Sequence, residues 1–353
     1  MIMQSKMERK RIYTIDFIKF IAACCIVCHH YQQLLDVRFS RANFYEGYFG
    51  FHNLVELFFI ISGFLTVRKN AYSVGKSKEY FLHIIYRIYP MAAIATIFTA
   101  LLEYAYYLKY NDYFWGVVPS LWRLFNSLLL TFRAGAIDTV GIINPLWFLC
   151  VLLICHVIYT FTIFISTKKK YNVIYLWILC IFIGESAVQS GINVPFYNTS
   201  MGRGTAFFVG VVLYLIWTKV GKSKLMILSS VVTIIVVWLT YRLEYNLYAD
   251  NQRGVLTYIL FPSLIIVLLK LDVIVPERIG TVFGFMGSIS YEIFLWHFGG
   301  ILVLEFINRG YLNLNICSYK TMLIFLLVIV GFSSISYIFV EKPISKKIFK
   351  YKL

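Results

Sequence analysis

Long apolar runs separated by short polar stretches dominate this chain. A helix needs about 20 mostly apolar residues to cross the hydrocarbon core of a bilayer. Runs of that length with few charges therefore predict an all-α integral membrane protein. Ten transmembrane helices are predicted, at roughly 13–35, 47–67, 84–107, 145–167, 172–191, 204–218, 225–241, 254–270, 282–304 and 321–340.

The apolar stretch 115–132 differs from these ten. It is short, and it carries Pro119, Arg123 and Asn126. We predict an interfacial or re-entrant helix rather than a span. Counting it as a span would also place the basic run 168–170 outside the cell, against the rule that Lys and Arg collect in cytoplasmic loops.

Composition supports the membrane prediction. The chain has 353 residues, of which 60% are apolar and only 14% charged, and its mean hydropathy is +0.74. Soluble domains carry about 25% charged residues, so a soluble enzyme and a secreted disulfide scaffold are excluded. The run Cys25-Ile-Val-Cys28-His29 matches a haem-attachment pattern, but it lies inside a predicted span. No haem, metal or disulfide site is predicted.

The net charge of +16 does not indicate a nucleic-acid partner, because apolar runs separate the basic residues. Lys and Arg instead concentrate in alternate connections between spans, which is typical of cytoplasmic loops that face anionic lipid. This asymmetry predicts cytoplasmic N- and C-termini, with membrane lipid as a partner. No internal repeat or linker divides the chain, so one domain over 1–353 is predicted.

Ionisable residues inside spans point to function, since each costs a few kcal/mol unless it is paired or faces water. The first span is the richest. Asp16 and Lys19 are three residues apart and share a helix face. Lys19 and His30 are eleven apart and also share a face, with His30 about 16 Å farther along the axis. His29 points about 100° away from His30.

Later spans add further polar residues. Glu56 lies in the outer half of the second span, and Ser62 and Gly63 lie near its cytoplasmic end. Arg87 stands at the cytoplasmic start of the third span, and Arg68 lies in the connection before it. Basic residues on this side would suit the entry of an anionic cofactor.

One histidine of the ninth predicted span, His297, is expected to lie near His30. His297 lies about 15 residues from the inner end of its span and His30 about 17 from that of its own, so the two rings are predicted at similar depth. This arrangement suits a catalytic base. His52, His83 and His156 are interpreted as loop residues or as helix-to-helix hydrogen-bonding residues.

Taken together, six segments resemble the acyltransferase 3 family of multi-pass membrane acyltransferases. Each motif is weak alone, but all six occur in family order and cover most of the chain, from 12 to 347. They are IYTIDFIKFIAACCIVCHHY at 12–31, VELFFIISGFL at 55–65, YRIYP at 86–90, NPLWFLCVLLICHVIY at 144–159, SISYEIFLWHF at 288–298 and VEKPISKK at 340–347.

The resemblance implies about ten helices around a channel and transfer of an acyl group, usually acetyl from acetyl-CoA, to a hydroxyl. His30 would be the catalytic base, and Ser62, Gly63 and Arg87 would lie near the coenzyme A entry, with Arg68 at the same basic mouth. The Trp-Phe-Leu form resembles the branch that acetylates surface polysaccharides and their lipid-linked precursors. The implied partners are a coenzyme A thioester and a glycan or lipid-linked sugar acceptor, at the bacterial inner membrane.

Three positions depart from the family pattern. Lys19 stands where most members carry Arg, which keeps the charge but loses the bidentate fork. Ile84 replaces a frequent Arg, and Leu152 replaces a frequent Glu.

Several alternatives stay open from the sequence. Lys19 either holds the acyl donor or pairs with Asp16, and either Glu56 or His297 orients His30 or assists the oxyanion. Direct transfer and a transient acyl-histidine are both compatible with these residues. Other function classes are an exporter or flippase for a polysaccharide or lipid-linked sugar, and a non-catalytic partner of a glycan synthase.

Overall fold

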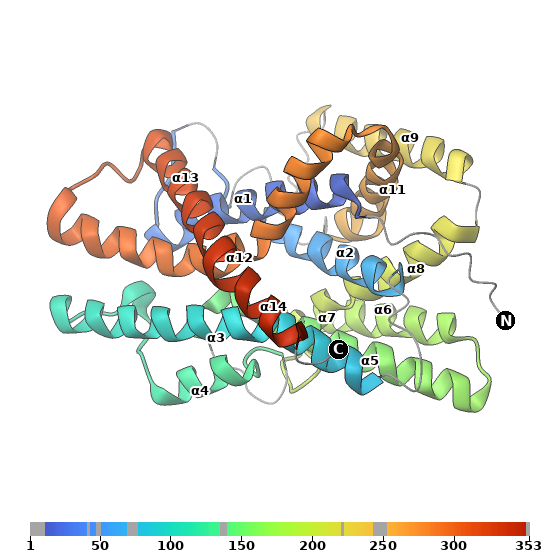
Figure 1. The fold of residues 1–353 in the computed structure, drawn as a ribbon, viewed down its shortest axis with the longest axis horizontal. Coiled ribbons are helices and arrows are strands. Elements are labelled where there is room, and N and C mark those ends of the chain that lie inside the picture. The colour runs from blue at the N-terminus through green and yellow to red at the C-terminus, as the bar shows by residue number, and fades with distance from the viewer. Residues whose placement is uncertain are drawn as a thin grey trace.

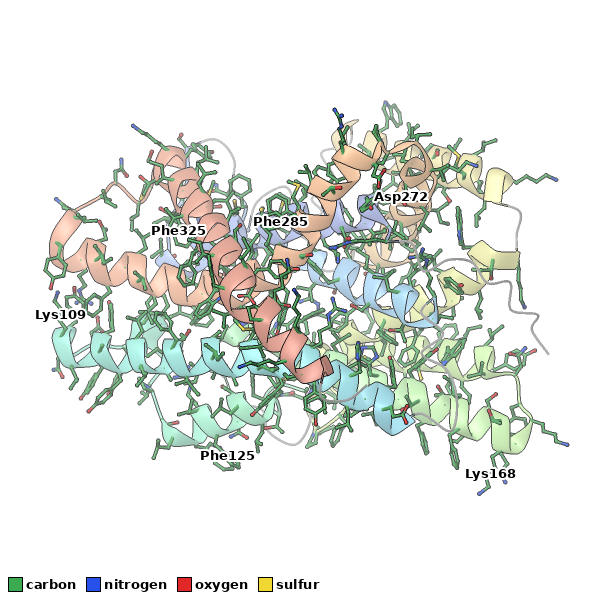
Figure 2. All side chains as sticks on the ribbon, in the orientation of Figure 1. Lys109, Phe125, Lys168, Asp272, Phe285 and Phe325 are labelled. Carbon is green, nitrogen blue, oxygen red and sulfur yellow. The ribbon has the colours of Figure 1, made fainter. Side chains whose placement is uncertain are left out.

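The computed structural model describes residues 11–40, 43–46, 51–68, 77–134, 140–219, 222–242 and 253–350. The named secondary-structure elements of these residues are all helical, and an isolated β-bridge joins Val194 and Tyr197. Several of the longest helices, including α3 and α5, run along the long axis of the molecule (Figure 1). Lys109 and Lys168 lie at opposite ends of that axis (Figure 2).

Fourteen α-helices are present in the described part of the chain. They are α1 Tyr13–Leu35, α2 Leu54–Arg68, α3 Ser77–Tyr110, α4 Leu121–Leu129, α5 Trp147–Lys169, α6 Val173–Ser190, α7 Thr199–Gly204, α8 Ala206–Lys219, α9 Lys222–Arg242, α10 Arg253–Val255, α11 Phe261–Leu271, α12 Glu277–Ile307, α13 Tyr319–Ser336 and α14 Lys342–Lys350. Short 3₁₀ turns and π-helical segments connect several of them, at Phe51–Asn53, Phe114–Gly116, Asn144–Leu146, Leu256–Leu260, Asp272–Ile274, Asn308–Leu312 and Tyr337–Glu341.

The prediction of about ten spans is confirmed. Nine helical segments of the described residues are long and apolar enough to cross a membrane, and the shorter apolar helix Lys224–Leu239 matches the seventh predicted segment. The predicted second segment starts at 47, and its residues 47–50 lie outside the described ones. The nine are Tyr13–Leu35, Phe51–Arg68, Glu79–Tyr110, Asn144–Lys169, Val173–Ser190, Thr199–Lys219, Arg253–Ile274, Glu277–Leu312 and Tyr319–Ile348.

The predicted non-spanning segment is the short helix α4. It has nine residues, too few to cross a bilayer, and it lies beside α3 (Figure 1). Its polar residues Arg123, Asn126 and Ser127 are buried. Its exposed side is apolar, as suits contact with lipid, and consists of Leu121, Trp122, Phe125 and Leu129.

Arg123 supports the irregular backbone on either side of α4. Its guanidinium donates to the carbonyl oxygens of Val118 (2.9 Å), Val140 (3.1 Å) and Gly141 (2.9 Å). Non-helical backbone inside a membrane protein is tolerated where its polar groups find partners within the protein. Arg123 therefore stabilises the chain that leads into α5.

Helices α1 and α12 form the central pair. A Cβ atom added at Gly280 would collide with the Tyr13 ring, and one added at Gly287 would collide with Asp16, so the small residues of α12 permit a close approach. Tyr13 and His30 are separated by as many residues as their partners Gly280 and His297. The two helices therefore run parallel and in register, which confirms the predicted equal depth of His30 and His297.

Candidate functional site

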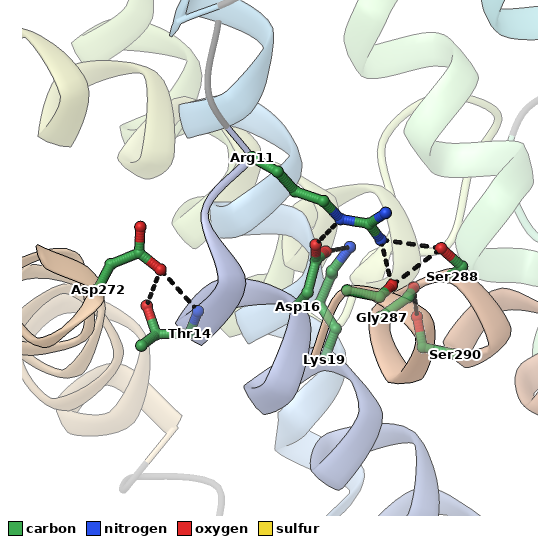
Figure 3. A network of polar contacts seen from close by, with 9 residues as sticks. Arg11, Thr14, Asp16, Lys19, Asp272, Gly287, Ser288 and Ser290 are labelled. Carbon is green, nitrogen blue, oxygen red and sulfur yellow. Dashed lines mark hydrogen bonds and ion pairs between the residues drawn. The ribbon is translucent and has the colours of Figure 1, made fainter. Parts of the chain in front are cut away.

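A polar cluster joins the first turns of α1 to α12 (Figure 3). Asp16 Oδ1 forms an ion pair with Lys19 Nζ at 2.6 Å, and Asp16 Oδ2 forms a second ion pair with Arg11. Arg11 also donates to the Gly284 carbonyl and to Ser288 Oγ, the latter at 2.8 Å. The contact that helical spacing predicted between Asp16 and Lys19 is therefore present, and Asp16 is almost fully buried by it.

The start of α1 is fixed from a different side. Thr14 donates its backbone N–H to Asp272 Oδ1 at 3.0 Å and its hydroxyl to the Leu268 carbonyl at 2.7 Å. A carboxylate at a helix N-terminus satisfies a free N–H and interacts favourably with the helix dipole. The position of Asp16 and Lys19 is thus set from both α11 and α12.

More positive charge lies around this cluster. Arg87, exposed on α3, is within electrostatic range of Lys19 and of Glu341. Arg68, at the end of α2, is within range of Asp272. The structure thus brings the positive charges of Lys19 and Arg87 within range of one another.

Farther along the same helix pair, aromatic rings form a row of imidazoles. The His30 and His297 rings stack with centroids 5.2 Å apart and planes inclined by 22°. His29 packs edge-on against His30 at 5.1 Å and lies 6.1 Å from His52. We call His52, His29, His30 and His297 the imidazole row. His52, expected in a loop, lies in the 3₁₀ turn before α2.

Hydrogen bonds define which ring nitrogens are available. His30 Nδ1 donates to Gln33 Oε1 at 2.8 Å, and His297 Nδ1 donates to the Ile293 carbonyl at 3.2 Å. A neutral imidazole has one N–H, so in both rings Nε2 carries the lone pair. His297 is 0% exposed, and its Nε2 has no hydrogen-bond partner among the residues that the structure describes. A buried acceptor without a partner costs about 1–3 kcal/mol, which suits a site that a substrate completes.

Glu56 is held by an arginine. Arg203 Nε donates to Glu56 Oε1 at 2.6 Å and its Nη2 to Oε2 at 2.8 Å, which is a bidentate pair. The same guanidinium donates to the His52 carbonyl at 2.7 Å and stacks on the Trp147 ring at 5.4 Å. Glu56 therefore stabilises, through Arg203, the turn that carries His52. The side chain that contacts His30 Nδ1 is Gln33 instead of Glu56.

Gly63 has a packing role in the structure. A Cβ atom at Gly63 would collide with the Phe207 carbonyl of α8, and one at Gly210 would collide with the Ile60 carbonyl of α2. Paired glycines of this kind let two membrane helices touch through their backbones. Ser62, the neighbour of Gly63, is half-buried on α2.

Two contacts at the site were missed from the sequence. Arg203 falls just before the predicted span 204–218, so its charge was assigned to a connection rather than to the membrane. Gln33 is neutral, so the pattern of ionisable residues in the first span does not include it. Its position one helical turn after His30 is the signal that would have found it.

A metal centre is not indicated by these side chains. Among the residues that the structure describes, no group of three or more His, Cys, Asp or Glu side chains is arranged to hold a metal ion. The imidazole row places its rings side by side instead of around a common centre.

The comparison with protein families decides the class of protein. A family model described as an acyltransferase domain matches residues 12–341. The chain belongs to the acyltransferase 3 family. This acyltransferase is thus a multi-pass membrane protein whose family transfers an acyl group from a donor to an acceptor, and the matched region contains the imidazole row. Neither the curated proteins nor the solved structures compared with it gave a match.

Proposed function

We propose that this acyltransferase moves an acetyl or other short acyl group from acetyl-CoA to a hydroxyl of an envelope polysaccharide or lipid-linked glycan, with His30 as general base. The observation that carries the proposal is His30 itself. Its Nδ1–H is bonded to Gln33, and its ring stacks on His297 between the central helices of the membrane domain. The enzyme would lie in the bacterial inner membrane with both termini in the cytoplasm, as the Lys and Arg distribution favours.

In the proposed reaction, His30 first takes up and then releases one proton. His30 Nε2 accepts the proton of the acceptor hydroxyl as its oxygen attacks the thioester carbonyl. The carbon–oxygen bond of the ester forms, the carbon–sulfur bond breaks, and the proton passes from His30 to the departing coenzyme A thiolate. A positioned base contributes typically ~10²–10⁴-fold to such a step. The His297 Nε2 lone pair can accept a hydrogen bond from a substrate N–H or O–H beside the reacting centre.

Charge favours a cytoplasmic entry for the donor. Coenzyme A is highly anionic, and Lys19 and Arg87 form a basic region nearer the start of α1 than His30 is. We assign Arg68 and Ser62, near the end of α2, to the same mouth. Gly63 would contribute by keeping α2 against α8. The acceptor would then reach His30 from the opposite side of the membrane.

Label transfer in inverted membrane vesicles tests the proposal. Vesicles carrying the wild type, His30→Ala or His156→Asn receive acetyl-CoA labelled in the acetyl group. His156 is a matched control, because it is also a buried membrane histidine but bonds Tyr80 at 2.6 Å, outside the imidazole row. We expect label in a glycan or lipid fraction from the wild type and the control, and a loss of about 100-fold or more in His30→Ala.

The opposite outcomes have equally clear meanings. Equal labelling by the wild type and His30→Ala at equal protein levels would refute His30 as the base. Failure of glycan export in the His30→Ala cells with acetylation intact would favour the exporter instead. The absence of label in all samples, including the wild type, would favour the non-catalytic partner.

A further inference from the structure

The outer end of α1 contains a side-chain pair whose geometry has a chemical consequence. His30 Nδ1 lies 2.8 Å from Gln33 Oε1, one helical turn away. The Tyr45 side chain lies within electrostatic range of Gln33. The Tyr45 ring in turn packs against His29 at 5.3 Å.

This hydrogen bond selects one of the two neutral forms of His30. A carbonyl oxygen can only accept, so its partner Nδ1 must carry the proton and Nε2 must carry the lone pair. Without such a partner, a neutral imidazole exchanges between the two tautomers. The tautomer with hydrogen on Nε2 is the wrong one for a base that acts through Nε2.

The neighbouring rings are fixed differently. His29 Nδ1 donates to the backbone carbonyl of Phe44 at 3.0 Å, and His297 Nδ1 donates to the backbone carbonyl of Ile293. Backbone carbonyls are present whatever the side chain. Of these three rings, His30 alone depends on a replaceable side chain for its Nδ1 partner.

We propose that Gln33 is a positioning residue, which holds His30 in the Nδ1–H tautomer so that Nε2 takes the proton of the acceptor hydroxyl. This inference rests on the proposed function, in which His30 is the base. Gln33 can keep its hydrogen bond when His30 is protonated, since the Nδ1–H remains. As a neutral amide it favours the imidazolium less than a carboxylate would.

Two substitutions separate this role from simple packing. Gln33→Leu keeps a similar volume but removes the acceptor, and Gln33→Glu keeps the acceptor and adds charge. Gln189→Leu is the matched control, because Gln189 is an exposed glutamine on α6 that donates to Glu185 Oε1, far along the chain from the imidazole row. None of the three changes touches the His30–His297 stack.

The direct readout is the nitrogen NMR spectrum of protein labelled with ¹⁵N-histidine, with the His30 signals assigned by their loss in His30→Asn. We expect the Nδ1–H tautomer for His30 in the wild type, Gln33→Glu and Gln189→Leu, and a mixture of tautomers in Gln33→Leu. The kcat for acetyl transfer should fall about 10-fold or more in Gln33→Leu, with little change in KM for acetyl-CoA. In Gln33→Glu the acid limb of the rate profile should move to higher pH.

The contrary results are distinct. An unchanged His30 tautomer in Gln33→Leu overturns the proposal, and so does a changed tautomer with unchanged kcat. If His30→Ala itself keeps full transfer, the proposed function fails instead, and the spectra still report whether Gln33 sets the tautomer.

Discussion

Two regions of the α1–α12 pair use polar side chains in opposite ways. Near the start of α1, Asp16, Lys19 and Arg11 are bonded to one another and to the backbone of α12. About 16 Å farther along α1, the His29, His30 and His297 rings each donate Nδ1–H to one oxygen of the protein. His297 Nε2 is buried and has no hydrogen-bond partner within the described ranges.

The comparison separates polar residues that stabilise the helix packing from those proposed to take part in the reaction. Charges inside a membrane domain are tolerated where they neutralise each other, so the Asp16 cluster fixes the register of α1 against α12. A catalytic base needs a lone pair that nothing else in the protein uses. Within the described part of the chain, His297 Nε2 keeps such a lone pair, and leaving it without a partner costs stability, as is common at functional sites.

The largest loss of stability is expected at Glu56 of α2, which is 0% exposed and pairs with Arg203. Glu56→Gln leaves the Arg203 charge without its carboxylate, and breaking a buried pair in this way costs about 3–5 kcal/mol. We expect a large fall in melting temperature, measured in detergent. Glu56→Gln combined with Arg203→Gln should recover part of it, because the uncompensated charge is gone. A double variant no more stable than Glu56→Gln would contradict this account of the pair.

A smaller loss is expected at Asp16. Asp16→Asn keeps the shape but leaves Lys19 and Arg11 without their carboxylate. Since the Arg11 side chain is nearly half exposed, water compensates part of the change, and we expect a loss of about 2–3 kcal/mol. Thermal unfolding measures it, with Ser288→Ala as a milder change in the same cluster. Unaltered unfolding in Asp16→Asn would show that the cluster does not hold the helix pair.

His297→Phe should have effects of opposite sign on stability and rate. The substitution keeps an aromatic ring for the stack with His30 and removes the unpartnered Nε2. We expect stability to stay equal or to rise by about 1 kcal/mol, while acetyl transfer falls at least about 10-fold. Unfolding and label transfer are measured on the same preparation. A destabilised variant with a normal rate would assign His297 to packing.

The smallest effect is expected just after the C-terminal end of α3. Arg309 Nη1 donates to Asp112 Oδ2 at 2.7 Å, and this hydrogen bond lowers the pKa of Asp112. A lowered pKa in the folded state adds stability above the unfolded pKa of about 3.9, and this stability is lost as the pH falls below that value. Because Asp112 is exposed, Asp112→Asn should lower the melting temperature only slightly at pH 7 and by still less at pH 3. A larger effect at pH 3 than at pH 7 would contradict a lowered pKa of Asp112 in the folded protein.

Helical periodicity was enough to predict part of this site. Asp16 and Lys19 share a face because they are three residues apart, and His30 and His297 share a depth because both spans start on the same side. These inferences use only distances along one helix. They were confirmed for the Asp16–Lys19 pair and for the stacked histidines.

Contacts between segments that are distant in the chain could not be predicted from local sequence patterns. Arg203 is 147 residues from Glu56, and no local pattern connects them. Arg123 bonds carbonyls on both sides of α4, which requires the loop to fold back first. Gly63 fits a motif and a packing contact equally well, and only the position of α8 distinguishes the two.

One paired measurement tests the central difference between the two regions. Melting temperature and acetyl transfer per folded molecule are determined for His30→Ala and Asp16→Asn in the same membranes. We predict that His30→Ala keeps the wild-type melting temperature and loses about 100-fold or more of the transfer rate, whereas Asp16→Asn unfolds at lower temperature and loses far less rate per folded molecule. A His30→Ala protein that transfers acetyl at the wild-type rate would contradict the account.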